Sequence, residues 1–289
     1  MSSLRFLVVD GNVAERRATH AESFGKAPGQ AYGDVLLEIA PKGSLYDICF
    51  PADEGSNLPQ GSGLAEYDGI ALTGSALHLW HREPAVDRQI ELAREAFRSK
   101  TAFFGSCWGL QMACVAAGGE VQKNQLGREV GFARNIAPND QGRQHPLLKG
   151  RPAAYDAPAI HLDIVTQPAT DHTVLASNPL TPMQAAEIRQ DGGVFWGIQY
   201  HPEFSLTEVA VILDRLEQPM INEGFVQNAD HLKSYTKDLI ALDQDRSRYD
   251  IAWKLGLDEQ VLNETFRLAE IRNWIELQVK PMASQRGRA

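Results

Sequence analysis

The chain of 289 residues has few cysteines, no excess of basic residues and no long apolar run. Its three cysteines, Cys49, Cys107 and Cys114, do not form the even, closely spaced set of a disulfide framework, so we expect a reduced, cytoplasmic protein. The net charge of -9 argues against a broad nucleic-acid surface, which would be basic. No apolar stretch approaches the ~18 residues of a membrane span, and the N-terminal apolar run is too short for a signal peptide. We therefore expect neither a membrane nor a nucleic-acid partner.

Hydrophobic residues make up 43% of the chain, and their spacing predicts alternating strands and helices. Short apolar runs predict strands over Leu4–Val9, Ser44–Phe50, Tyr67–Thr73, Thr101–Gly105 and Val194–Tyr200. Helices are predicted over Pro84–Ser99, over Trp108–Ala117 and from Ser205 onward. Residues 13–33 read as a short helix and a loop, residues 55–63 as turns, and residues 121–194 as a mixed or antiparallel part. The alternation indicates a three-layer α/β domain over residues 1–216.

Residues 217–289 show no strand pattern and predict a helical C-terminal extension with a loose tail. Amphipathic helices are expected around Leu232–Leu242 and Glu259–Val279. The second has an apolar face made of Val261, Leu262, Phe266, Ile271, Trp274, Ile275 and Leu277. Such a face most often packs against its own core, here the α/β domain. The alternative interpretation is a homodimer or partner surface.

The stretch Gly105-Ser106-Cys107-Trp108-Gly109 is the most informative in the sequence. It joins a predicted strand to a predicted helix, and a sharp turn between the two needs small residues on either side of its apex. The apex side chain is then exposed at the edge of the sheet, in a strained backbone conformation. Here it is a cysteine, whose thiolate the start of the following helix favours. Cys107 is therefore a candidate nucleophile, although a lone cysteine after an apolar strand is more often a small buried hydrophobe.

A cysteine nucleophile needs a base, and the base needs an orienting group. His201-Pro202-Glu203 comes directly after the predicted strand 194–200. Because the ends of parallel strands gather at one edge of a sheet, His201 can meet Cys107 despite their separation in sequence. The proline stiffens the turn, so Glu203 can sit behind the imidazole and support its charged form. The two motifs together predict a Cys-His-Glu triad, whereas His201 alone would read as a structural histidine.

These two motifs, extended to Gly105–Gln111 and Gly197–Glu203, resemble those of the class I (triad-type) glutamine amidotransferases. The chain is most similar to stand-alone members that are like the amidotransferase domain of GMP synthase, and the resemblance runs from Leu4 to Leu216. Weaker motifs at residues 67–75, 127–131, 145–148 and 161–165 agree with it. The resemblance implies a flavodoxin-like open sheet and hydrolysis of the glutamine side-chain amide. We expect no cofactor and no metal.

The resemblance also implies roles for individual residues. Cys107 would be the nucleophile, His201 the general base and then acid, and Glu203 the residue that orients His201. The backbone N–H groups of Gly74 and Trp108 would form the oxyanion hole. The implied substrate-binding positions are Ser75, Gln111, Ile160, Leu162 and Asp163. From its own pattern, Gln111 could equally be a polar residue on a helix surface, and His161 is expected to support the site rather than to react.

Three positions depart from the family pattern near the inferred pocket. Ala76 follows Gly74-Ser75 where many relatives have glycine-proline-rich turns, Leu162 replaces a usual glycine, and Trp108 replaces a usual leucine or similar residue. The added bulk leaves the substrate open. The first hypothesis is a glutaminase that acts alone or supplies ammonia to a synthase on another chain. The second is a γ-glutamyl hydrolase or peptidase, and the third is a non-catalytic binding subunit, against which the intact triad argues.

Overall fold

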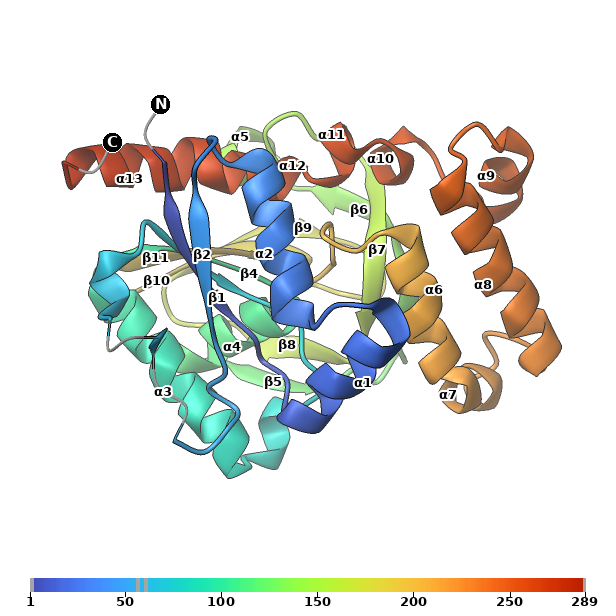
Figure 1. Ribbon diagram of the computed structural model, residues 1–289, viewed down its shortest axis with the longest axis horizontal. Coiled ribbons are helices and arrows are strands. Elements are labelled where there is room, and N and C mark those ends of the chain that lie inside the picture. The colour runs from blue at the N-terminus through green and yellow to red at the C-terminus, as the bar shows by residue number, and fades with distance from the viewer. Residues whose placement is uncertain (1–2, 56–57, 60–61, 288–289) are drawn as a thin grey trace.

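The computed structural model describes residues 3–55, 58–59 and 62–287. Nine strands of this described part form one sheet in the order β2-β1-β3-β4-β11-β10-β9-β6-β7 (Figure 1). The first five, which are parallel, are β2 (Leu45–Cys49), β1 (Arg5–Val9), β3 (Gly69–Leu72), β4 (Ala102–Ser106) and β11 (Gly193–Ile198). The antiparallel remainder comprises β10 (Ala185–Gln190), β9 (His172–Ser177), β6 (Glu129–Pro138) and β7 (Tyr155–His161). The parallel half has the 2-1-3-4-5 order of a flavodoxin-like sheet, which confirms the predicted fold class.

Helices cover both faces of the sheet, because alternate residues of each buried strand point to opposite sides. Leu7 and Val9 of β1 face α3 (Pro84–Ser99) and α4 (Trp108–Ala116). Phe6 and Val8 face α2 (Pro28–Ile39) and the C-terminal helices. Two strands outside the sheet, β5 (Glu120–Lys123) and β8 (Asp163–Gln167), pair antiparallel beside α4. The predicted mixed part over residues 121–194 is thus confirmed.

The chain between β1 and β2 differs from the prediction of one short helix and a loop. It contains two helices, α1 (Ala14–Phe24) and α2, and Pro28 lies in the first turn of α2, where a proline is tolerated. Gly29 and Gly33 made this segment read as a loop. A Cβ atom at Gly33 would lie 2.6 Å from the Tyr46 ring, so the glycine lets α2 pack closely on β2. Part of the predicted turn region 55–63, and the end of the predicted tail, lie outside the described residues.

After β11 the chain is helical, as predicted. The helices are α6 (Leu206–Arg215), α7 (Glu217–Asn222), α8 (Ala229–Gln244), α9 (Tyr249–Leu255), α10 (Glu259–Leu262), α11 (Glu264–Arg267), α12 (Ala269–Trp274), a π-helical turn (Ile275–Val279) and α13 (Lys280–Gln285). In Figure 1, α8 stands beside α6, and α12 and α13 lie across one end of the molecule, close to both termini. The domain boundary after residue 216 stays a prediction.

The α12–α13 segment packs on the sheet, which agrees with the interpretation that its apolar face covers the core of the same chain. The Trp274 ring is fully buried, stacks on Phe104 at 5.4 Å and lies 5.9 Å from Phe6. However, the predicted apolar face does not stay on one side. Phe266 and Leu277 are 40% and 36% exposed, because the helix breaks at Leu268 and the π-helical turn shifts the register. A homodimer through these helices stays a prediction.

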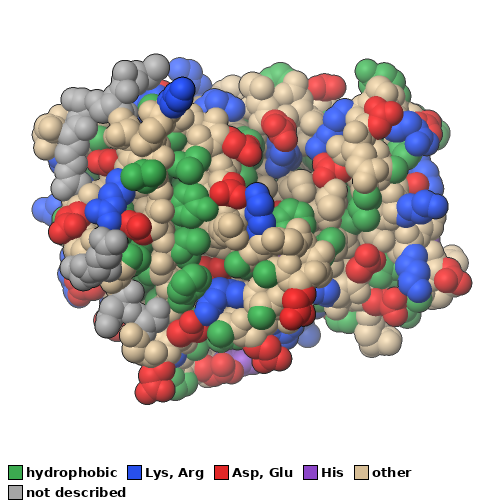
Figure 2. Space-filling view, viewed as in Figure 1, with side chains coloured by type: hydrophobic (Ala, Val, Ile, Leu, Met, Phe, Trp, Pro, Cys, Tyr) green, Lys and Arg blue, Asp and Glu red, His purple; other side chains and the backbone are tan. Residues whose placement is uncertain are grey.

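The surface carries charges of both signs. Figure 2 shows acidic and basic side chains interspersed on one face of the molecule, so this face has no large acidic patch despite the net charge of -9. Among the described residues, no helix is both long and apolar enough to cross a membrane.

Candidate active site

Cys107 occupies a strained turn between β4 and α4. Its φ of 51° lies in the left-handed region, which non-glycine residues rarely adopt, at a cost of ~1–3 kcal/mol. Its N–H donates to the carbonyl of Ile198 at 2.7 Å, which ties the turn to β11. A Cβ atom at Gly105 would lie 2.7 Å from Gly109 Cα, and one at Gly109 would lie 2.9 Å from the backbone oxygen of Leu72. Both glycines are therefore required by close backbone approach, as the motif predicted.

His201 reaches Cys107 because β4 and β11 are parallel neighbours, with Ile198 opposite Ser106. His201 Nδ1 lies 2.7 Å from Glu203 Oε1, and both side chains are buried. Burial lowers the pKa of His201, but the Glu203 carboxylate, the negative charge of Cys107 and hydrogen bonds to both outweigh it and raise the pKa to about 10. The three predicted triad residues therefore lie together, with the imidazole between the sulfur and the carboxylate.

Three side chains that the motifs did not single out hold Glu203 and His201 in place. Ser106 Oγ donates to Glu203 Oε2 at 3.0 Å and is itself 3.0 Å from the Tyr32 hydroxyl on α2. Burial raises the pKa of Tyr32 well above its ordinary value, so this hydroxyl stays protonated. The Phe204 ring stacks on the imidazole, with centroids 4.0 Å apart and planes within 5°. Ser106 was within reach of sequence reasoning, since it precedes the cysteine; Tyr32 had no such signal.

Arg267 of α11 also contacts this turn. Its Nη1 donates to the carbonyls of Pro202 at 2.6 Å and Phe204 at 2.9 Å, so it brackets Glu203 from the C-terminal extension. The side chain is 6% exposed, and burial lowers the pKa of Arg267. No motif links this arginine to a turn more than sixty residues earlier, which is why the sequence did not reveal it.

A cavity of 380 Å³ opens at Cys107 and His201. All but one of the predicted site residues line it, namely Gly74, Ser75, Gln111, Ile160, Leu162, Asp163, Cys107, His201 and Glu203. Trp108 is the exception. Its indole is buried, donates from Nε1 to Gln89 Oε1 at 2.9 Å and lies against Gly11. The expectation that the indole adds bulk near the pocket is therefore wrong, because the side chain points back into the core at the start of α4.

Gly74 and Gln111 are placed by close contacts. A Cβ atom at Gly74 would lie 2.6 Å from His201 Cε1, so only glycine lets this backbone run against the imidazole. Gln111 is 3% exposed, and its Nε2 donates to the carbonyl of Asp163 at 2.8 Å and to Gln199 Oε1 at 3.2 Å. The alternative of a polar residue on the helix surface is wrong. Gln111 instead fixes the segment that carries Asp163 at one end of the cavity.

That end of the cavity is polar and held by further hydrogen bonds. Asp163 Oδ2 lies 2.6 Å from His78 Nδ1, whereas its Oδ1 is buried without a partner among the described residues. His161 lies 2.9 Å from Glu129 Oε2 and 3.1 Å from the carbonyl of Asp163. Despite burial, hydrogen bonds and the charge of His161 lower the pKa of Glu129, which stays a carboxylate. His161 thus supports the segment around Asp163, in the place expected for it.

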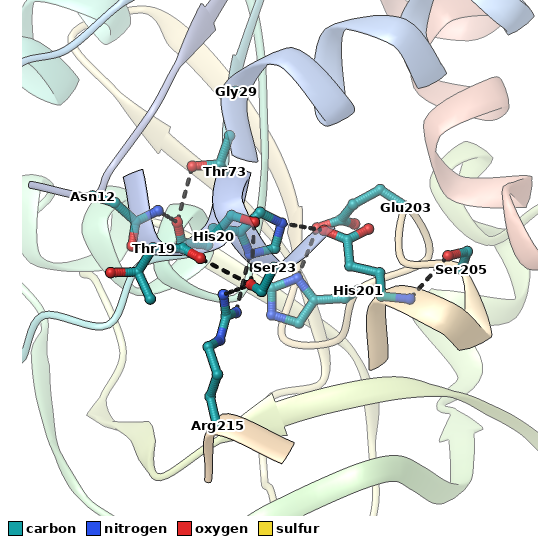
Figure 3. Close-up of polar contacts among 12 residues, drawn as sticks. Asn12, Thr19, His20, Ser23, Gly29, Thr73, His201, Glu203, Ser205 and Arg215 are labelled. Atoms are coloured by element: carbon teal, nitrogen blue, oxygen red, sulfur yellow. Dashed lines mark hydrogen bonds and ion pairs between the residues drawn. The ribbon is translucent and has the colours of Figure 1, made fainter. Parts of the chain in front are cut away.

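Helices α1 and α6 line another part of the cavity, and no motif predicted their side chains. His20 Nε2 lies 3.1 Å from Glu208 Oε1, and both residues are buried. Figure 3 shows Arg215 of α6 pointing toward His20 and Ser23 of α1. His201 and Glu203 line the same cavity. Burial raises the pKa of Glu208. The cavity therefore has a second polar wall besides the one at Asp163.

The family model described as glutamine amidotransferase class-I matches residues 48–215. The chain belongs to this family. It is 34% identical over 293 residues to the γ-glutamyl-L-1-hydroxyisopropylamide hydrolase of a Pseudomonas species, and the match covers 99% of this chain and 97% of that relative. It is 30% identical over 180 residues to the glutamine-hydrolyzing GMP synthase of Aeropyrum pernix, and this match covers 62% of this chain but only 32% of that relative.

Solved structures show the same architecture. A glutamine amidotransferase from Thermotoga maritima matches with a TM-score of 0.64 at 16% identity, covering 94% of this chain and 99% of its own. This class-I amidotransferase is accordingly a cysteine-dependent amide hydrolase, and the interpretation as a non-catalytic binding subunit is not supported. The roles of individual residues and the substrate belong to the proposal that follows.

Proposed function

We propose that this class-I amidotransferase hydrolyses γ-glutamyl amides whose amide nitrogen carries an organic substituent. The observation that carries the proposal is the extent of the cavity, which continues from Cys107 and the Asp163 end to the wall formed by α1 and α6. The carboxamide of free glutamine ends in NH2 and has nothing to place against that wall. The near-full-length relative, by its name a hydrolase of a substituted γ-glutamyl amide, supports the same substrate class.

In the proposed reaction, Cys107 and His201 carry the chemistry. The thiolate of Cys107 attacks the γ-carbonyl carbon, and the backbone N–H groups of Gly74 and Trp108 stabilise the oxyanion, a contribution of several kcal/mol in such sites. The imidazolium of His201 gives its proton to the amide nitrogen as the C–N bond breaks, so the amine leaves and a γ-glutamyl thioester remains. His201 then takes a proton from water, which attacks the thioester and releases glutamate and the thiolate.

The remaining predicted residues have positioning and binding roles in this proposal. Glu203 holds the His201 tautomer with Nε2 toward the sulfur and stabilises the imidazolium. The γ-glutamyl part binds at the end of the cavity formed by Ser75, Gln111, Ile160, Leu162 and Asp163. There the unpartnered Oδ1 of Asp163 is an acceptor suited to the substrate's α-ammonium group.

A glutaminase is the second candidate function, favoured by the family match and by the similarity to GMP synthase. In that case ammonia would be released or passed to a synthase on another chain. Free glutamine is the smallest γ-glutamyl amide, so both candidates use the same triad. They differ in whether a substituent on the nitrogen raises or lowers kcat/KM.

The two candidates are separated by measuring glutamate release from glutamine, γ-glutamylethylamide and γ-glutamyl-L-1-hydroxyisopropylamide. The proposal expects a higher kcat/KM for the substituted amides, and turnover of glutamine alone would reject it in favour of the glutaminase. Cys107→Ser should abolish all turnover, whereas Cys114→Ser, a buried cysteine away from the cavity, should not. Iodoacetamide should label Cys107 first, because burial raises the pKa of Cys114 to about 11 and of Cys49 to about 12. Equal labelling would contradict an activated thiolate.

A further inference from the structure

Two arginines stand on the cavity wall formed by α1 and α6. Arg16 and Arg215 both line the cavity that reaches Cys107, and both are exposed at its mouth. Arg215 donates from Nη1 to Ser23 Oγ at 2.9 Å and lies 3.0 Å from His20 Nδ1 through Nη2, so its guanidinium is held by a hydroxyl and a ring nitrogen (Figure 3). Within the described part of the chain, Arg16 has no ion-pair partner. Among the residues that the structure describes, therefore, no carboxylate forms an ion pair with either of these two cationic groups at the mouth.

One neighbouring carboxyl group, that of Glu208, compensates this positive pair in part. Partial burial lowers the pKa of Arg215, the charge of Glu208 raises it and the charge of Arg16 lowers it, so the two cations lie near each other and near one carboxyl group. Glu208 Oε1 lies 3.1 Å from His20 Nε2, no ion pair joins Glu208 to either arginine within the described residues, and burial raises the pKa of Glu208. A third arginine of the cavity, Arg128, is neutralised by a bidentate pair with Glu223. Two adjacent guanidinium groups repel each other, and an anion placed between them relieves that repulsion.

We propose that Arg16 and Arg215 bind a carboxylate on the amine part of the substrate, so that γ-glutamyl amino acids are the preferred substrates. This inference rests on the proposed γ-glutamyl amide hydrolysis. A guanidinium is the side chain best suited to a carboxylate, which it can bind through two parallel hydrogen bonds. Ile212 and Leu216 on the same wall provide an apolar surface for the side chain of the amino acid. The Asp163 end, by contrast, presents an acidic group and suits the α-ammonium of the γ-glutamyl part.

A matched pair of substrates tests the inference. γ-Glutamyl-L-alanine and γ-glutamyl-L-1-hydroxyisopropylamide differ only in a carboxylate where the second has a hydroxymethyl group. The inference expects kcat/KM to favour γ-glutamyl-L-alanine by roughly tenfold or more, mainly through KM, and this ratio to shrink at high ionic strength. Because the readout is a ratio of two substrates on one protein sample, partial unfolding cancels.

Arg16→Gln and Arg215→Gln should each bring the ratio toward one. Arg128→Gln is the matched control, since this arginine lines the same cavity but is already paired, and its ratio should stay within about twofold of the wild-type value. A wild-type ratio of one or below, or an unchanged ratio in both Arg16→Gln and Arg215→Gln, would overturn the inference while leaving γ-glutamyl amide hydrolysis in place. Turnover of glutamine with neither substituted amide would instead reject the proposed function itself.

Discussion

Arg267 connects the C-terminal extension to the turn that carries Glu203. It donates to the carbonyls on both sides of Glu203, those of Pro202 and Phe204, while Glu203 lies 2.7 Å from His201 Nδ1. We predict that Arg267→Met destabilises the protein and lowers kcat. Methionine keeps an unbranched apolar stem of similar length but removes both donors, so the carbonyls lose their partners while the space stays filled.

The expected loss of stability follows from the two carbonyls. A buried acceptor left without its donor costs ~1–3 kcal/mol, so two cost about 2–6 kcal/mol. Part of this loss of stability is offset, because the variant no longer has a charged guanidinium to bury. Burial disfavours that charge, as the lowered pKa of Arg267 indicates. We expect the free energy of unfolding to fall by about 2–4 kcal/mol. If the turn shifts Glu203 away from the imidazole, kcat falls by roughly 10- to 100-fold. KM should change little, because Arg267 does not line the cavity.

Chemical denaturation and steady-state kinetics measure the two effects on the same sample. Asn273→Ala is the matched control, since Asn273 Nδ2 also donates from the extension to two backbone carbonyls, of Leu147 and Lys149, both at 2.9 Å. It should lose stability and retain kcat. An Arg267→Met protein that loses stability but keeps kcat within about twofold would refute the reasoning and leave Ser106 as the group that holds Glu203. An equal loss of kcat in Asn273→Ala would assign the effect to general destabilisation.

Two further predictions concern the turn at Cys107 and the imidazole of His201. Gly105→Ala should lower the free energy of unfolding by ~1–3 kcal/mol and reduce kcat, because the new Cβ would lie 2.7 Å from Gly109 Cα. Gly63→Ala, which has open space around it, should change neither quantity. Thermal unfolding followed by circular dichroism, together with steady-state kinetics, measures both. Cys107→Ala should lower the pKa of His201 from about 10, since the negative charge of the cysteine helps to raise it; an unchanged pKa in an NMR titration would contradict the charge pairing. A raised histidine pKa contributes stability that is complete below ~6.5 and is lost as pH rises through about 10, so Cys107→Ala should move that loss to lower pH.

The placement of Cys107, His201 and Glu203 together was predictable because each half of the set is local in sequence and one topological rule joins the halves. Gly105 and Gly109 mark the turn at Cys107, His201 follows a strand, and neighbouring parallel strands end at one edge of the sheet. The supporting contacts of Tyr32 and Arg267 obey no such rule. Each contact depends on how a helix packs on the folded sheet. Helix α2 was not predicted because Gly33, which allows the helix to pack closely on β2, is a residue typical of loops.

Trp108 shows the same limit at the centre of the site. Its position directly after the cysteine suggested that a residue bulkier than the usual leucine would narrow the pocket. The side chain instead occupies space left by Gly11, where a Cβ atom would lie 2.7 Å from Trp108 Cδ1, and Gln89 satisfies its N–H. The sequence thus identifies the residue that follows Cys107, but the direction in which its side chain points depends on how other helices and strands pack around it. Because the indole points away from the cavity whereas Leu162, α1 and α6 line it, we predict that substitutions at Leu162, α1 or α6 change the substrate preference more than Trp108→Phe.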